Sequence, residues 1–245
     1  GLWVPTAPTP AVNPYASQRR LLVPGVSQGT SLAPPPPYSS VPGSPFWNMV
    51  KEVYDKSFVT TADQKAAAIY YRDAPGYPAG GAFVSIFSQV LSKASPSLDD
   101  AALAYAKVGL AQHDATVILF TGKYNYKLIR PVTYIQNEMG HPEWQTFIPT
   151  PNHPEFPSGH ATTNGAVLSM LADMFGRNFQ ITLHTYDYLG LAPRSFNSFE
   201  AMGIEMADSR LWGGLHYSAT CIKSRAQGKR VAYNILQKIN FWRFH

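Results

Sequence analysis

Residues 153–166 read HPEFPSGHATTNGA, and this stretch predicts the start of the helix around which the rest of the chain is arranged. Serine is a favoured N-cap residue and proline is tolerated at a helix start, so Pro157-Ser158-Gly159-His160 predicts a turn that opens a helix. The first turn of that helix offers unpaired N–H groups, a hydroxyl and an imidazole, beside a glycine that blocks no approach. Such an arrangement binds an oxyanion and places a proton donor next to it.

Cations and a second imidazole flank this helix start in the sequence. Upstream, Lys123 and Arg130 stand seven residues apart, which predicts that they share one face of a helix. Downstream, the segment SRLWGGLH supplies Arg210 and His216, with a Gly-Gly pair that allows a tight turn before the histidine. Arginine can hold two oxyanion oxygens at once. A structural ion pair explains any one of these cations, whereas a shared anion site explains all of them together.

These three motifs resemble the type 2 phosphatidic acid phosphatase superfamily, which includes soluble bacterial acid phosphatases and the vanadium-dependent haloperoxidases. The resemblance spans residues 105–235 and rests on three motifs. In the first, six residues separate a lysine from Arg-Pro; the second is Pro-Ser-Gly-His; in the third, five residues separate Ser-Arg from a histidine. It implies that the histidine matching His216 is phosphorylated or binds vanadium, and that the one matching His160 is the general acid–base. The residues that it implies as oxyanion ligands are Lys123, Arg130, Ser158, Gly159 and Arg210.

Two further positions favour the haloperoxidase branch, and one departs from the superfamily pattern. His153 matches a family position that lies near the bound anion, where bromide- and iodide-oxidising relatives carry histidine; a loop histidine that caps a turn is the alternative. Phe120 matches an aromatic pocket position. Many members carry an aspartate four residues after the final histidine, which orients that imidazole, but this chain has Thr220 there. We therefore expect a main-chain carbonyl, or a group such as Asp208 or Glu205, to orient it instead.

The composition is that of a globular chain without a membrane span. The 245 residues are 45% apolar and 14% charged, enough for one large domain or two small ones. No apolar run approaches the roughly 18 residues of a membrane helix, which excludes the integral-membrane lipid phosphatases. The net charge of +5 lacks the dense basic runs of nucleic-acid-binding proteins. We expect no nucleic-acid or membrane partner, and a secreted or periplasmic location.

The chain divides near residue 46. Residues 1–46 are rich in proline, which disfavours helix and sheet and predicts an extended surface segment, with a disordered tail as the alternative. Residues 47–245 have helical periodicity and predict an all-α bundle as the catalytic domain. Helices are expected at 45–56, 60–71, 82–91, 97–121, 158–175, 197–211 and 217–240, with a loop at 139–157. Asp114 is expected either to pair with a site cation or to lie on the surface.

The resemblance implies a vanadate-dependent peroxidase that oxidises iodide or bromide, rather than chloride, with hydrogen peroxide to a hypohalous species. A soluble acid phosphatase with a phosphohistidine intermediate and a non-catalytic oxyanion-binding module are the alternatives. Residues 1–6, GLWVPT, resemble a segment between the two halves of longer bacterial haloperoxidases. We therefore expect either a further N-terminal half or a homo-oligomer.

Overall fold

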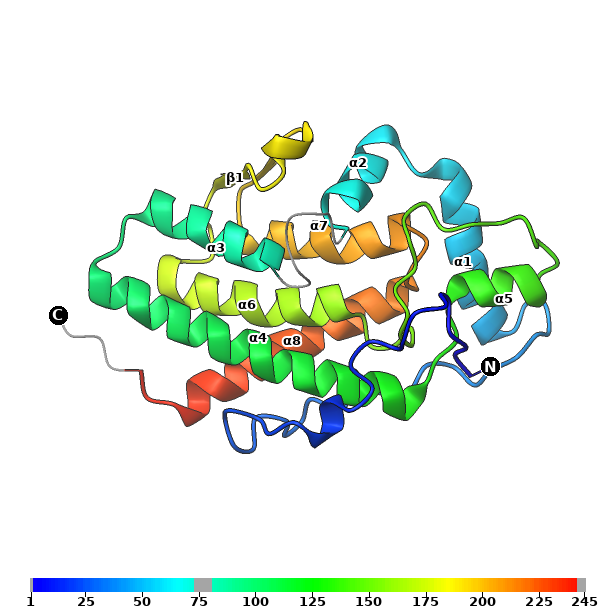
Figure 1. Cartoon of the computed structure of the whole chain (residues 1–245), viewed down its shortest axis with the longest axis horizontal. Helices are drawn as coiled ribbons and strands as arrows, with labels where there is room; N and C mark the ends of the chain where they lie inside the picture. The colour runs from blue at the N-terminus through cyan, green and yellow to red at the C-terminus, as the bar shows by residue number, and fades with distance from the viewer. Residues whose placement is uncertain (1, 73–80, 242–245) are drawn as a thin grey trace.

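The computed structural model describes residues 2–72 and 81–241, which form a helical bundle (Figure 1). The helices are α1 (Pro45–Val59), α2 (Ala62–Tyr70), α3 (Gly81–Ala94), α4 (Leu98–Tyr126), α5 (Pro131–Asn137), α6 (Gly159–Phe175), α7 (Phe199–Trp212) and α8 (Ser218–Lys238). Strands β1 (Ile181–Leu183) and β2 (Arg194–Phe196) pair antiparallel. The 3-10 turns are η1 (Ala16–Gln18) and η2 (Asp187–Leu189). The predicted all-α bundle is confirmed, and no helix in the described ranges is long and apolar enough to cross a membrane.

Polar caps set the starts of most helices. Five helices begin after a serine or threonine that accepts a hydrogen bond from the N–H three residues later, which satisfies a donor without an intrahelical partner. These caps are Ser44, Thr61, Ser97, Ser158 and Ser198. The predicted helices therefore begin close to the observed ones, whereas α4 runs five residues beyond its predicted end. The short helix α5 and the β1–β2 hairpin were not predicted.

Helix α6 lies at the centre of the bundle, in contact with α4, α7 and α8 (Figure 1). Its buried side chains, such as Val167 and Leu171, join a core with residues of α3, α4, α7 and α8. A second core lies at the end formed by α1 and α5, around Phe46, Tyr134 and Tyr217. The start of α6 lies close to this second core, because Phe156 just before it belongs to the same cluster.

Two glycines bring α6 and α8 into close contact. A Cβ atom built on Gly165 would lie 2.2 Å from the carbonyl oxygen of Arg225, and one built on Gly228 would lie 1.9 Å from that of Thr162. Real Cβ atoms do not approach other atoms this closely, and in both cases the obstacle is rigid helix backbone. The two helices therefore pack backbone against backbone, and their relative position is fixed where they cross.

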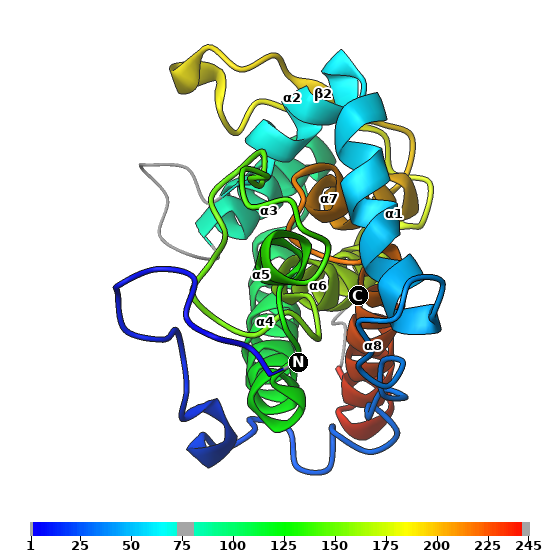
Figure 2. The same cartoon turned by 90° about the vertical axis from the view of Figure 1, so that its right-hand side faces the viewer.

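The N-terminal segment, residues 2–44, runs along the outside of the bundle (Figure 2, blue). Before α1 the only helical residues described are the three of η1. The buried carboxylate of Asp114 in α4 accepts hydrogen bonds from the N–H groups of Leu22 at 2.7 Å and Val23 at 2.9 Å. Asp114 therefore anchors this segment, and neither expectation for it, a site cation or the surface, was right. The domain boundary near residue 46 stays a prediction.

The last helix also holds the N-terminal segment. The Gln227 side chain in α8 donates to the carbonyl of Thr30 at 2.9 Å, and Asn234 donates to the carbonyl of Val26 at 2.7 Å. Both amides are buried, so the bonds form away from solvent. Residues that are separated by about 200 positions in the chain are thus bonded directly.

Gly228→Ala should destabilise the fold strongly, because its methyl group would overlap the backbone of α6. Overpacking of this kind costs about 3 kcal/mol of unfolding free energy. Gly109→Ala is the matched control: this glycine is also within a helix, but a Cβ there meets nothing within 4 Å. It should raise stability by up to about 1 kcal/mol. Urea unfolding measures both, and equal effects from the two variants would contradict the close crossing.

Candidate oxyanion site

The candidate site lies where four helix ends meet. Helices α4 and α7 run toward the right in Figure 1, and α6 and α8 start there and run back. The C-terminal turns of α4 and α7 carry Lys123 and Arg210, while the start of α6 carries Ser158, Gly159 and His160. Residues far apart in the sequence are therefore brought together at one end of the bundle.

Lys123 is fully buried in the last turn of α4. Its Nζ atom donates to the carbonyl oxygens of Pro154 at 2.7 Å and Glu155 at 3.1 Å. Burial, together with the nearby charge of Arg130, lowers the pKa of Lys123 well below its usual value. Lys123 thus holds the loop that leads into α6, and its side chain lies close to Arg130 and Glu155.

Arg130 reaches the site in a different way from that predicted. Helix α4 ends at Tyr126, Lys127 adopts the left-handed conformation, and Arg130 is the N-cap of α5. Lys123 and Arg130 therefore do not share a helix face, and the prediction that they do was wrong. They converge because the chain turns between the two helices.

The buried guanidinium of Arg130 is held mainly by main-chain carbonyls. Its Nε atom donates to the main-chain carbonyl of His153 at 2.9 Å, and one terminal nitrogen donates to the carbonyl of Leu215 at 3.0 Å. The other terminal nitrogen donates to the carbonyl of Pro151 at 3.4 Å. The last nitrogen also lies 3.0 Å from the Nδ1 atom of His153. Burial lowers the pKa of Arg130 to about 10, so the group remains a cation at neutral pH.

The start of α6 has the predicted capping arrangement. The Ser158 side chain accepts from the N–H of Ala161, and the Ser158 N–H donates to the Ser224 hydroxyl in α8 at 2.8 Å. Gly159 is the first residue of the helix, so its N–H has no intrahelical acceptor. The partial positive charge of a helix N-terminus adds to that of the cations.

His216 follows the turn that ends α7. Gly214 has a φ of +79°, a left-handed conformation that glycine adopts without strain, and the N–H groups of Leu215 and His216 both donate to the carbonyl of Arg210. The Arg210 guanidinium donates to the carbonyl of Tyr71 at 2.9 Å. The predicted tight turn thus places His216, which is buried, beside the cations.

Glu155 is the group that contacts the Nδ1 atom of the His216 ring. Its Oε1 atom lies 2.8 Å from Nδ1 of His216, and the side chain is completely buried. The expectation that Asp208, Glu205 or a main-chain carbonyl would do this was wrong; Glu205 instead pairs with Arg194. Burial raises the pKa of Glu155 to about 7, against the lowering effects of Arg130 and Lys123.

The two candidate halide-pocket residues contact each other. The rings of Phe120 and His153 meet edge to face, with centroids 5.4 Å apart. Burial lowers the pKa of His153 well below its usual value, and the charges of Lys123, Arg130 and His160 lower it further. His153 is therefore neutral at neutral pH and lies within the field of the same cations.

The electrostatics of the site favour an anion. Burial and the charges of Arg130, Lys123 and Arg210 lower the pKa of His216 well below its usual value, so its imidazole is neutral at neutral pH. The carboxylate that contacts this group is Glu155, which is outnumbered by the three cationic side chains. A neutral imidazole with an available nitrogen lone pair can serve as a metal ligand or as a nucleophile.

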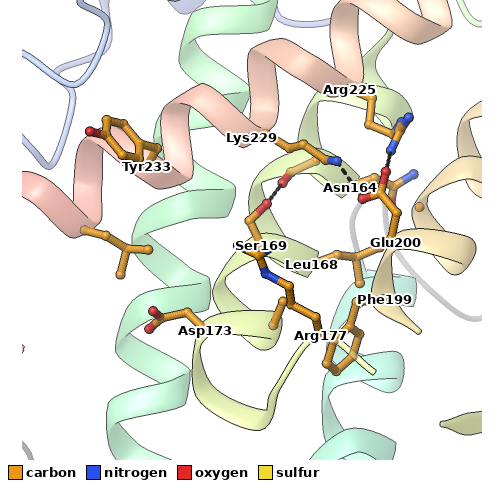
Figure 3. Close-up of a pocket in the computed structure, with 14 residues that line it drawn as sticks. Asn164, Leu168, Ser169, Asp173, Arg177, Phe199, Glu200, Arg225, Lys229 and Tyr233 are labelled. Atoms are coloured by element: carbon orange, nitrogen blue, oxygen red, sulfur yellow. Dashed lines mark hydrogen bonds and ion pairs between the residues drawn. The ribbon is translucent and has the colours of Figure 1, made fainter. Parts of the chain in front are cut away.

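One cavity is separate from this site (Figure 3). It has a volume of about 720 Å³ and lies between α6, α7 and α8. Glu200 pairs there with Arg225 and with Lys229, which links α7 to α8. None of the predicted site residues lines it.

The three other described histidines lie outside the site. They are His113, which contacts Asp114; His141, which stacks on Tyr54; and His184, which contacts Asp187.

The sequence comparison identifies the family. A model of the VCPO second helical-bundle domain matches residues 103–242, more than half of the chain. The chain belongs to this family. Among curated proteins, no sequence matches the chain significantly.

Solved structures of bacterial vanadium enzymes share the fold. A bacterial vanadium-dependent iodoperoxidase superposes with a TM-score of 0.92 and 29% sequence identity over 98% of this chain and 61% of its own. An apo-type bacterial vanadium-dependent chloroperoxidase gives a TM-score of 0.76 and 17% identity over 93% of this chain and 57% of its own. The holo-type bacterial vanadium-dependent chloroperoxidase gives a TM-score of 0.65 and 16% identity over 93% of this chain and 54% of its own. The chain thus spans 54–61% of the length of these structures. It is a vanadium haloperoxidase-like protein.

Within this VCPO-family bundle the structure brings His216, His153 and Phe120 together with the three cations. Ser158, Gly159 and His160 form the start of α6, directly after the loop that Lys123 holds. The roles of all these residues remain predictions. The residues missed from the sequence are Glu155, which lies inside the opening motif, and Thr220, which was noted only as a departure. Glu155 is the only acidic residue of the 153–166 stretch, and this was the signal available. Nothing in the sequence showed that it would meet a histidine 61 residues later.

His153→Phe should make the unfolding free energy less sensitive to acid. The unfolded chain protonates this histidine near pH 6.5, whereas the folded protein resists protonation until a lower pH. His153 therefore costs stability as the pH falls below about 6.5, at up to about 1.4 kcal/mol per pH unit. The variant should lose that slope, although it loses a contact with Arg130 at every pH. Unfolding curves from pH 7 to 4.5 measure the slope, and parallel curves for both proteins would contradict the shift.

Proposed function

We propose that this protein binds vanadate and oxidises iodide or bromide with hydrogen peroxide, giving a hypohalous species. The observation that carries the proposal is the neutral, buried His216 among Arg130, Lys123 and Arg210. One imidazole ligand surrounded by cationic donors suits an oxyanion of a metal better than a bare metal cation.

The residues present fit vanadate. Nε2 of His216 would be its protein ligand, and the guanidinium and ammonium groups would hold its oxygens together with the Ser158 hydroxyl and the Gly159 N–H. Bound vanadate supplies a Lewis acid that activates peroxide without a change in its own oxidation state. His160, at the second position of α6, would take up and return the proton of the incoming peroxide. The cations would stabilise negative charge that moves onto oxygen as the halide is oxidised.

A soluble acid phosphatase is the second candidate, and Glu155 is the observation that favours it. A nucleophilic histidine benefits from a carboxylate on its other nitrogen, and His216 has one at 2.8 Å. The absence of aspartate at position 220 therefore does not count against this candidate. His160 would then protonate the leaving group.

His216→Ala and His160→Ala should have different effects. The first removes the proposed ligand and should abolish stable vanadate binding. The second should keep binding and lower turnover by about 100- to 10,000-fold, because it removes a general acid–base. Vanadate affinity can be measured by equilibrium dialysis, and turnover by triiodide formation from iodide and peroxide. The same loss of affinity in both variants would refute the division of roles.

Iodide should be oxidised fastest, bromide more slowly and chloride very little. Chloride is the hardest of the three to oxidise and needs the strongest positive field on the oxygens. In this chain one terminal nitrogen of Arg130 lies 3.0 Å from Nδ1 of His153, so a donor of this cation points at the histidine and not at a bound oxygen.

Peroxide-dependent halogenation of a phenol-type indicator, with each halide from acidic to neutral pH, measures this order. Chloride turnover equal to iodide turnover would refute the order. Hydrolysis of p-nitrophenyl phosphate by the vanadate-free protein, without halide oxidation after vanadate loading, would favour the phosphatase.

A further inference from the structure

The proton position on His216 matters for any ligand that its Nε2 atom binds. A neutral imidazole carries its proton on either Nδ1 or Nε2, and only the Nδ1–H form leaves a lone pair on Nε2. Two separate groups contact the two ring nitrogens of His216, and their donor or acceptor character indicates which nitrogen carries the proton.

On the Nδ1 side the partner is an acceptor fixed by other donors. Oε1 of Glu155 lies 2.8 Å from Nδ1 and also accepts the N–H of Tyr217 at 3.1 Å. Its other oxygen accepts the hydroxyl hydrogen of Thr220 at 3.0 Å. Because both oxygens are engaged, the carboxylate has a set orientation and presents a lone pair to Nδ1.

On the Nε2 side the neighbour is a donor. A terminal nitrogen of Arg130 lies 3.4 Å from Nε2, and a guanidinium group has no acceptor. The favourable arrangement therefore has a lone pair on Nε2 and the proton on Nδ1. The two contacts select the same tautomer independently.

We propose that Glu155, oriented by Thr220, is a positioning residue that holds His216 in its Nδ1–H tautomer and directs the Nε2 lone pair at the oxyanion. This inference rests on the proposed vanadate site and deepens it. In relatives with aspartate four residues after the final histidine, that aspartate orients the ring. Here a glutamate from another segment does so, and Thr220 supports the glutamate instead of replacing the aspartate.

This arrangement predicts that Thr220→Asp has opposite effects on vanadate affinity in the wild-type protein and in the Glu155→Gln variant. Thr220→Asp alone would replace a donor with a second carboxylate about 3 Å from Glu155, where two like charges repel. In the Glu155→Gln background the same aspartate would supply the missing carboxylate. A residue that only fills space would not show such a reversal.

The experiment combines the ¹⁵N NMR signals of His216 in vanadate-free protein with orthovanadate affinity measured by equilibrium dialysis. Wild type should show the Nδ1–H tautomer. Glu155→Gln should show mixed tautomers and bind vanadate about 10- to 100-fold more weakly. Thr220→Asp alone should also weaken binding, whereas the double variant should recover most of the affinity and the tautomer.

Thr220→Val keeps the buried carboxylate of Glu155, and it tests the same inference if Glu155→Gln does not fold. It should weaken vanadate binding several-fold. Thr162→Val is its matched control, because Thr162 is an equally buried threonine whose hydroxyl donates to Gln227 and does not contact Glu155. It should leave vanadate affinity unchanged.

Unaltered tautomer and affinity in Glu155→Gln would overturn the inference, as would unaltered affinity in Thr220→Val or a further loss in the double variant. Failure of the proposed function has a different signature. Wild type would then bind vanadate through an Nδ1–H His216 and still oxidise no halide, which leaves the positioning role intact.

Discussion

The close crossing of α6 and α8 is the constraint on which the rest of the structure depends. Gly165 and Gly228 allow the two backbones to touch, and the Ser158 N–H is bonded to Ser224 just beyond the contact. His216 lies two residues before α8 begins. The oxyanion-binding start of α6 and the imidazole are therefore placed by one rigid helix pair. A change in this crossing would move both halves of the site relative to each other.

The second requirement is to keep several cations buried together without neutralising them. Main-chain carbonyls do most of this work: Lys123 uses two of them, Arg130 uses three and Arg210 uses one. Carbonyl dipoles solvate a cation but carry no net charge, so they stabilise the group and leave its field in place. Glu155, the one carboxylate in direct contact with His216, serves the imidazole. The remaining positive charge is available to a bound anion.

Local signals in the sequence predicted the fold well, because helical periodicity and polar caps such as Ser97 and Ser198 act within a few residues. They also predicted site residues, since the three motifs resemble a known superfamily, and the structure brings Lys123, Arg130 and His216 close together. These local signals could not predict how the backbone turns to bring distant residues into contact. Lys123 and Arg130 were placed on one helix, but a left-handed Lys127 breaks that helix between them. Glu155 and Asp114 were missed or misplaced because their partners lie 61 and about 90 residues away.

The bonds from α8 to the N-terminal segment have a consequence for how the chain acquires its structure during synthesis. Gln227 and Asn234 hold Thr30 and Val26, so these two bonds cannot form until α8 has left the ribosome. His216, too, emerges after every other predicted ligand. The bonds to Val26 and Thr30 and the placement of His216 thus both depend on residues after 215, and contacts of such long sequence separation form slowly. A chain that ends before α8 would therefore lack the bonds to Val26 and Thr30, and Asp114 would still hold residues 22 and 23.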